Sequence, residues 1–201
     1  WEWGGDDKLR LYPNPQIASS WKSDWSTNYK TINCTGIVVG PDNVMNPEAA
    51  ANAARAEETR IASLKVGMVD FETVACESGT DPKGDPANKW EWGNDDKLRL
   101  YPNPQIASSW KSDWSTNYKT INCTGIVVGP DNVMNPEAAA NAARAEETRI
   151  ASLKVGMVDF ETVACESGTD PKGDPANKWE WGNDDKLRLY PNPQIADSWV
   201  S

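Results

Sequence analysis

Tryptophan is the residue type in this chain that is best suited to bind a partner. The 201 residues include 11 tryptophans. An indole ring can anchor a protein interface, or it can stack on the apolar face of a sugar while neighbouring Asp and Asn side chains take the hydroxyl groups. The alternative is that the rings form the core of a small module, because indole buries a large apolar area. The candidate binding residues are Trp1, Trp3, Trp21, Trp25, Tyr29, Trp90, Trp92, Arg99, Trp110, Trp114, Tyr118, Trp179, Trp181 and Trp199.

Residues that could catalyse a reaction are scarce. The chain has no His, which removes the Ser-His-Asp and Cys-His arrangements and the commonest general base. Asp6 and Asp7 form an adjacent carboxylate pair, but acids beside a turn are mostly solvated surface. Asp81 and Asp85 could hold a hard cation only weakly, since they lack the spacing of a calcium loop. We therefore expect no enzymatic activity, no cofactor and no resident metal.

The four cysteines are suited to structural bridges. Cys34 and Cys76 lie in the first 89 residues, and Cys123 and Cys165 lie in the next 89. Two thiols in each copy, without any His, favour a disulfide over a zinc site, which needs four ligands. We predict the pairs Cys34–Cys76 and Cys123–Cys165. The alternative is two buried free thiols in each copy.

Two acceptor sequences for N-glycosylation surround the first cysteine of each copy. They would carry the sugar on Asn33 and Asn122. Together with disulfides, they favour a secreted or extracellular location, or another oxidising compartment.

The chemistry-bearing residues recur because the sequence is repeated. Residues 1–89 and 90–178 differ at one position, Gly5 against Asn94, and residues 179–201 begin a third copy. A near-identical internal repeat indicates one structural module used more than once, and such arrays gain by avidity or by length. We predict repeat domains at 1–89 and 90–178, with a partial third copy at 179–201 that completes the second module.

Each copy is predicted to begin with a β-hairpin. Residues 89–101 alternate apolar and polar side chains on both sides of Gly93–Asp96, as hairpin strands do. Glu91 would then meet Arg99 across one face, and Asn94 would take the positive φ of the turn. The residues expected on the opposite face are Trp90, Trp92, Leu98 and Leu100.

A short aromatic helix and a strand are predicted next. Trp110, Trp114 and Tyr118 recur at every fourth position, which places them on one face of a helix capped by one of the two preceding serines. Residues 120–129 are rich in β-branched side chains and predict a buried strand.

A long amphipathic helix is predicted after that strand. Asn135 is a capping residue, Pro136 suits the first helical position, and an alanine-rich run sustains the helix. Apolar residues at spacings of three and four extend the pattern as far as Cys165. A competing interpretation breaks the helix at Gly156 and begins a strand. Residues 167–177 have the composition of a linker.

One local stretch resembles a known family. Residues 57–64 are similar to a fragment of the Glu…Arg-Ile-Ala-Met-Leu helix of chlorophyll-binding antenna proteins. The spacing from Glu to Arg differs and the flanking apolar span is absent, so the resemblance assigns no family.

The net charge of −10 bears on the partners. An acidic chain is repelled by nucleic acid and by anionic membranes, and no segment has the ~18 continuous apolar residues of a membrane span.

The sequence thus predicts an α+β protein of tandem 89-residue repeats, each an aromatic hairpin and short helix followed by a strand and a long amphipathic helix. We expect a non-enzymatic structural or tethering protein whose Trp-rich units dock on a protein partner or on neighbouring repeats. The alternative function is a secreted, lectin-like or adhesive protein that binds glycans.

Overall fold

The computed structural model describes residues 2–3, 9–10 and 29–191, and within them the fold is mixed α+β. The chain divides into two compact units. Unit 1 comprises Trp1–Asn52 and Glu146–Ser201, and unit 2 comprises Ala53–Ala145. The candidate residues outside the described ranges, or described there only in their backbone, are Trp1, Trp3, Trp21, Trp25 and Trp199.

The sheet of unit 2 is built from one continuous stretch of chain. Its strands lie in the order β8, β5, β6, β7, β9. β5 and β8 are parallel, whereas the other neighbours are antiparallel. The elements in chain order are β5 (Thr73–Cys76), β6 (Trp90–Trp92), β7 (Leu98–Leu100), α3 (Pro104–Trp110), β8 (Lys119–Ile121) and β9 (Val133–Met134).

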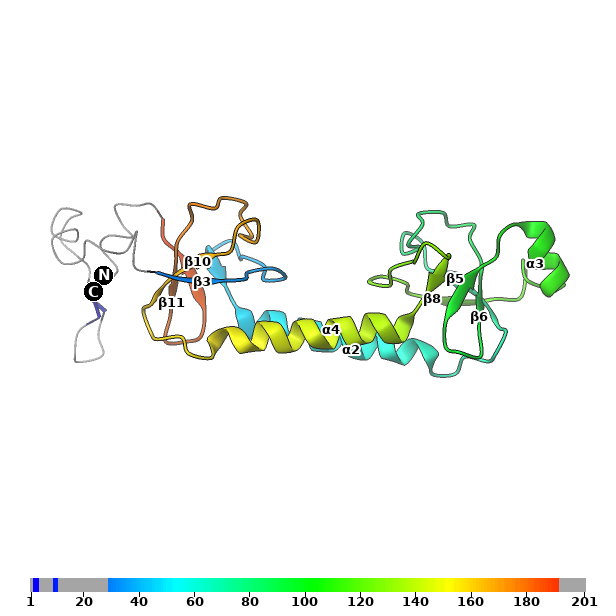
Figure 1. The fold of residues 1–201 in the computed structure, drawn as a ribbon, viewed down its shortest axis with the longest axis horizontal. Helices are drawn as coiled ribbons and strands as arrows, with labels where there is room; N and C mark the ends of the chain where they lie inside the picture. Colours follow the sequence, from blue (N-terminus) through cyan, green and yellow to red (C-terminus); the bar gives the residue numbers. More distant parts are fainter. Residues whose placement is uncertain (1, 4–8, 11–28, 192–201) are drawn as a thin grey trace. The chain divides into compact units, whose positions relative to one another are not determined.

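The sheet of unit 1 has the same order of equivalent strands but is assembled from two distant stretches. Its order is β3, β10, β11, β12, β4, and Figure 1 shows β3, from the N-terminal part, beside β10, from the C-terminal part. Each strand stands 89 residues from its counterpart in unit 2. The bounds are β3 (Lys30–Ile32), β4 (Val44–Met45), β10 (Thr162–Cys165), β11 (Trp179–Trp181) and β12 (Leu187–Leu189). A separate two-stranded sheet pairs β1 (Glu2–Trp3) with β2 (Leu9–Arg10).

The sheets therefore do not follow the repeat boundaries of the sequence. In unit 2, β5 comes from residues 1–89, whereas β6 to β9 come from residues 90–178. In unit 1 all three copies contribute strands to one sheet. The compact units have boundaries other than residues 89 and 178, because each hairpin pairs with a strand of the preceding copy.

The hairpin prediction is confirmed in its register. Trp90 lies opposite Leu100, Glu91 opposite Arg99, and Trp92 opposite Leu98. The turn prediction was wrong in one detail. The residue with positive φ is Asp96, at 58°, and not Asn94, because the backbone hydrogen bonds that close the turn run from Gly93 to Lys97 and from Asp96 to Gly93.

The aromatic helix is shorter than predicted and begins earlier. Asn103 caps α3, its side-chain oxygen accepting from the Ile106 N–H at 2.9 Å. The helix ends at Trp110, since Lys111 has an extended backbone. Residues 110, 114 and 118 therefore do not share a helical face. The strand predicted at 120–129 is limited to β8 at Lys119–Ile121 and a bridge between Val128 and Met134.

The long helix is confirmed at its start and corrected at its end. The side chain of Asn135 accepts from the Ala138 N–H at 3.1 Å, and α4 spans Pro136–Ala151. A 3₁₀ turn follows, then Gly156 with φ 77°, then β10. The predicted continuation to Cys165 was wrong, and the break followed by a strand was right. The equivalent helix α2 spans Pro47–Ala62. With α3 these are the α-helices of the described residues, and none of them has the length and hydropathy to traverse a lipid bilayer.

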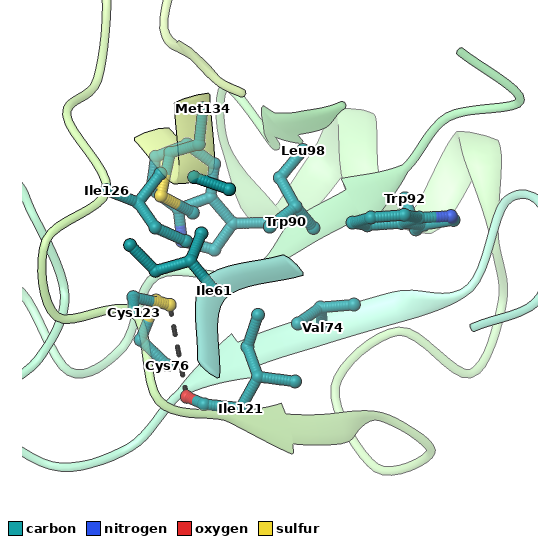
Figure 2. Packing of buried hydrophobic residues seen from close by; sticks show 11 residues of the cluster. Ile61, Val74, Cys76, Trp90, Trp92, Leu98, Ile121, Cys123, Ile126 and Met134 are labelled. Carbon is teal, nitrogen blue, oxygen red and sulfur yellow. Dashed lines mark hydrogen bonds between the residues drawn. A yellow bond between two sulfur atoms is a disulfide. The ribbon is translucent and has the colours of Figure 1, made fainter. Parts of the chain in front are cut away.

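Both cores are centred on the hairpin tryptophans. In unit 2, Trp90 and Trp92 pack with Val74 of β5 and with Ile61 of α2. Figure 2 shows Trp90 beside Ile126 and Met134. Ile126 belongs to the loop after β8 and Met134 belongs to β9, and both are buried in this core. The equivalent cluster of unit 1 contains Ile32, Ile37, Met45, Ile150, Val163, Trp179, Trp181 and Leu187.

Candidate functional site

The hairpin tryptophans are core residues of an interface between copies of the repeat. Trp90, at 0% exposure, belongs to the second copy, but it pairs across the sheet with Val74 of the first. Its indole Nε1 donates to Asp81 Oδ2 at 3.1 Å, and Asp81 also belongs to the first copy. Trp179 repeats both contacts with Val163 and Asp170. These rings are therefore unavailable to a sugar or to an external protein surface.

Asp81 organises residues 78–88, the first-copy equivalent of the stretch 167–177 that was predicted to be a linker. Its Oδ1 accepts from the Lys83 N–H at 2.8 Å and from Asn88 Nδ2 at 3.1 Å. Its Oδ2 accepts from the indole Nε1 of Trp90. Lys83 Nζ then reaches Asn132 Oδ1, beside β9, at 2.8 Å. The stretch predicted as a linker, and its equivalent in the first copy, are thus ordered connections between strands of one sheet. Both oxygens of Asp81 accept hydrogen bonds from protein donors.

A second tie between copies is made by an arginine at the end of α2. Arg60 Nη1 donates to the Asn122 carbonyl at 3.0 Å, and Nη2 donates to the Thr124 carbonyl. Glu57 holds the guanidinium in place through Nε and Nη2. Hydrogen bonding with Arg60 lowers the pKa of Glu57. Arg149 makes the same contacts with Asn33, Thr35 and Glu146 in unit 1.

The disulfides also join different copies. The bonds are Cys76–Cys123 in unit 2 and Cys34–Cys165 in unit 1. All four cysteines are oxidised as expected, but the predicted pairs Cys34–Cys76 and Cys123–Cys165 were wrong. The reason is that β5 lies parallel to β8 and β10 lies parallel to β3, which brings each cysteine to one of another copy. Two disulfides fit an oxidising compartment.

The glycosylation candidates lie next to these bridges. Asn122 Nδ2 donates to Glu77 Oε2 at 2.8 Å, and Asn33 Nδ2 donates to Glu166 Oε2 at 2.9 Å. Both side chains are half-buried. Nδ2 is the atom that would carry the sugar, and modification would leave it a single hydrogen with which to keep each of these contacts between copies.

The aromatic segment after the hairpin is the more exposed part of the candidate set. Tyr101 is buried, and its hydroxyl lies 3.2 Å from Thr73 Oγ1. Trp110 and Trp114 pack on Tyr101, with ring centroids 5.3 and 6.3 Å away. Trp110 remains 49% exposed and Tyr118 43% exposed. The rings of Tyr118 and its counterpart Tyr29 lie under Lys89 and Lys178 respectively.

Charged residues of the hairpin are paired locally. Arg99 donates to both carboxylate oxygens of Asp95, at 2.8 and 2.7 Å, which lowers the pKa of Asp95 to about 2.

Glu180, the counterpart of Glu91, is 8% exposed. Burial raises the pKa of Glu180 to about 7, although Arg188 opposes this shift.

Two further features were missed by sequence reasoning. Phe71 has a positive φ of 64°, which is rare for a bulky residue. It is held by its N–H donating to the Trp92 carbonyl and by its carbonyl accepting from Lys111 Nζ.

The second feature is a pocket of about 190 Å³ in unit 2. It is lined by Ile61, Ala140 and the Arg144–Glu58 ion pair. Its volume is smaller than the roughly 300 Å³ and more of most small-molecule sites.

Other proteins give no guidance about this site. Comparison with protein families, with curated proteins and with solved structures finds no match to the chain. Among residues 29–191, no group of three or more His, Cys, Asp or Glu side chains is arranged to hold a metal ion.

Proposed function

We propose that this is a non-enzymatic structural protein in which the Trp-rich hairpin of each copy docks on the preceding copy. The observation that carries the proposal is the burial of Trp90 against Val74, Ile61 and Asp81, which all come from the preceding copy. Such docking joins successive copies through strands, hydrogen bonds and a disulfide. In an array made in this way each copy contacts only its neighbours, and the stability of the array is approximately the sum of the terms for the copies and for the joints between them.

The same proposal places the protein in a secreted or extracellular setting, where the Cys76–Cys123 and Cys34–Cys165 bonds persist. No partner other than the chain itself is needed for the docking of the hairpin.

The docking role is tested by replacing one buried and one exposed tryptophan. Trp90→Ala should lower the free energy of unfolding of unit 2 by about 3–5 kcal/mol, because it leaves a large cavity between copies. Trp110→Ala is the matched control, and it should cost clearly less because the ring is half-exposed. Urea titration followed by circular dichroism measures both. If Trp90→Ala leaves stability unchanged, the hairpin is not a structural joint between copies.

Carbohydrate binding is the second candidate, and the exposure of Trp110 and Tyr118 favours it. Asp113 and Asn117 lie in the same segment and could take sugar hydroxyl groups, though Asn117 Nδ2 already donates to Asp113. A glycan array decides between the two functions. Saturable binding that Trp110→Ala abolishes would establish the second candidate, and an array without such hits would leave structural docking as the function.

A further inference from the structure

The joint between copies is made twice in this chain, with two different chain connections. In unit 2, the segment 119–134 pairs with the segment 73–100, and residues 101–118 join them directly. In unit 1, the segment 30–45 pairs with the segment 162–189, and no such short connection joins them. The cysteines of the two bonds are accordingly 47 and 131 residues apart in sequence.

The contacts of the two joints are nevertheless the same. Lys119 Nζ donates to the Gly67 carbonyl at 2.9 Å, and its counterpart Lys30 Nζ donates to Gly156 at 2.6 Å. The backbone N–H of Cys123 donates to Thr80 Oγ1 at 3.1 Å, as Cys34 does to Thr169.

The edge strands are tied in the same way as well. The Leu100 N–H donates to the Asn132 carbonyl at 3.1 Å, and the Leu189 N–H donates to Asn43 at 2.8 Å. Lys172 reaches Asn43 Oδ1 at 2.7 Å, as Lys83 reaches Asn132. The same contacts thus form in both joints, whichever length of chain connects the paired segments.

We infer that the joint of unit 1 also forms between two molecules, the segment 162–189 of one chain receiving the segment 30–45 of a second copy. This inference rests on the proposed function and extends it from copies within a chain to separate chains. The exchanged joint keeps every strand pair and hydrogen bond of the closed one. Because the two segments are different surfaces, the contact is heterologous, and repeated exchange gives rings or open chains of molecules.

The long connection makes exchange compete with closure within one chain. The effective concentration of a tethered segment falls roughly as the 3/2 power of the connecting length. When the chain refolds from the unfolded state, the separations of 131 and 47 residues therefore make closure of unit 1 on its own segment about fivefold less favourable than closure of unit 2. Exchange should consequently occur at unit 1 first and should increase with protein concentration.

The experiment uses two full-length variants that each lack one cysteine of the unit 1 bond, so that neither can close this bond within one chain. Both also carry Val66→Ile and Val127→Ile at exposed positions, which add a methylene group to the Cys76 peptide and to the Cys123 peptide and so distinguish them from the otherwise identical Cys165 and Cys34 peptides. Cys34→Ser is labelled with nitrogen-15, Cys165→Ser is unlabelled, and the two are mixed, unfolded, reduced and refolded with oxidised glutathione. A bond between Cys165 of the first chain and Cys34 of the second transfers two electrons to glutathione disulfide. The two thiols lose their protons, and two molecules of reduced glutathione are released.

Non-reducing electrophoresis followed by digestion and mass spectrometry gives the readout. We expect a covalent dimer whose linked peptide has one labelled and one unlabelled half and carries no extra methylene group, in an amount that rises with protein concentration. The control mixture is Cys76→Ser with Cys123→Ser in the same marked chain, whose linked peptide carries both extra methylene groups, and it should give about fivefold less mixed-label dimer. Dimers linked through two identical cysteines carry a single label state and are scored separately.

The inference is overturned if the unit 1 mixture gives no more mixed-label dimer than the control at any concentration. That result would leave the proposed function intact, provided that Trp90→Ala still destabilises unit 2. If Trp90→Ala has no effect on stability, the proposed function fails whatever the dimer yield.

Discussion

At the scale of single residues, Asp81 adds a polar contact to the joint between copies that Trp90 makes with its indole ring. One oxygen accepts from the buried indole and the other holds the loop that carries Lys83 and Asn88. A buried N–H group that loses its acceptor costs about 1–3 kcal/mol. The acid nine residues before Trp90, and its counterpart nine residues before Trp179, is therefore a structural requirement.

Replacing Asp81 by Ala should lower the free energy of unfolding of unit 2 by about 1–3 kcal/mol. The control Asp85→Ala removes a side chain whose carboxylate accepts from the Ala87 N–H in the same loop but does not reach the core. Urea titration compares the two variants. Equal losses would show that the indole hydrogen bond contributes nothing of its own.

Glu180 should make the stability of unit 1 depend on pH. Its folded pKa of about 7 lies above the ordinary value near 4.5. Above about pH 4.5 the unfolded chain releases this proton while the folded chain retains it. Stability should therefore be highest below pH 4.5 and fall through pH 7, by up to about 3 kcal/mol.

The variant Glu180→Gln should remove this fall with pH, because the neutral amide cannot ionise. Glu91→Gln, at the equivalent but half-buried position of unit 2, is the matched control. Thermal unfolding between pH 4 and pH 8 measures the slope for both. A slope that survives in Glu180→Gln would assign the pH dependence to another group.

At the scale of elements, the sequence predicts those features of the fold that depend on residues close together in the chain. The alternation around Gly93–Asp96 is local, so the hairpin and its register follow from it. The start of α4 follows equally from Asn135 and Pro136. The helix end and the aromatic segment were harder, because an apolar spacing of four also occurs outside helices.

The pairing of copies was not predictable from local pattern. Cys34 and Cys123 stand in identical sequences, as do Cys76 and Cys165. A bond within a copy and a bond between copies therefore look the same in the sequence. The parallel pairs of β5 with β8 and of β3 with β10 decide between them, and these pairs depend on contacts far apart in the chain. The roles of Asp81 and Arg60 were hidden for the same reason.

Removing residues 179–201 should destabilise unit 1 and spare unit 2. The deletion takes away β11 and β12, which lie between β10 and β4, whereas the strands of unit 2 stay complete. Protection from hydrogen exchange should be lost in residues 30–45 and 162–165. A chain ending at residue 191 is the control, since it keeps both strands. Loss confined to residues 90–134 would contradict this arrangement.

At the scale of the whole molecule, the central claim is that each joint connects different copies of the repeat. Digestion of the native protein cannot test it, because the cysteine peptides of the copies are identical. Two substitutions at exposed positions remove this ambiguity. Val66→Ile marks the Cys76 peptide and Val127→Ile marks the Cys123 peptide, and these valines are 77% and 81% exposed, so the fold should tolerate both changes.

The decisive measurement is the mass of the disulfide-linked peptides from this doubly marked chain, digested with trypsin without reduction. If Cys76 is bonded to Cys123 and Cys34 to Cys165, one linked product carries both extra methylene groups and the other carries none. The parallel pairs of β5 with β8 and of β3 with β10 predict this result. Two products that each carry one extra methylene group would show bonds of Cys34 to Cys76 and of Cys123 to Cys165, and would contradict the joining of copies on which the account depends.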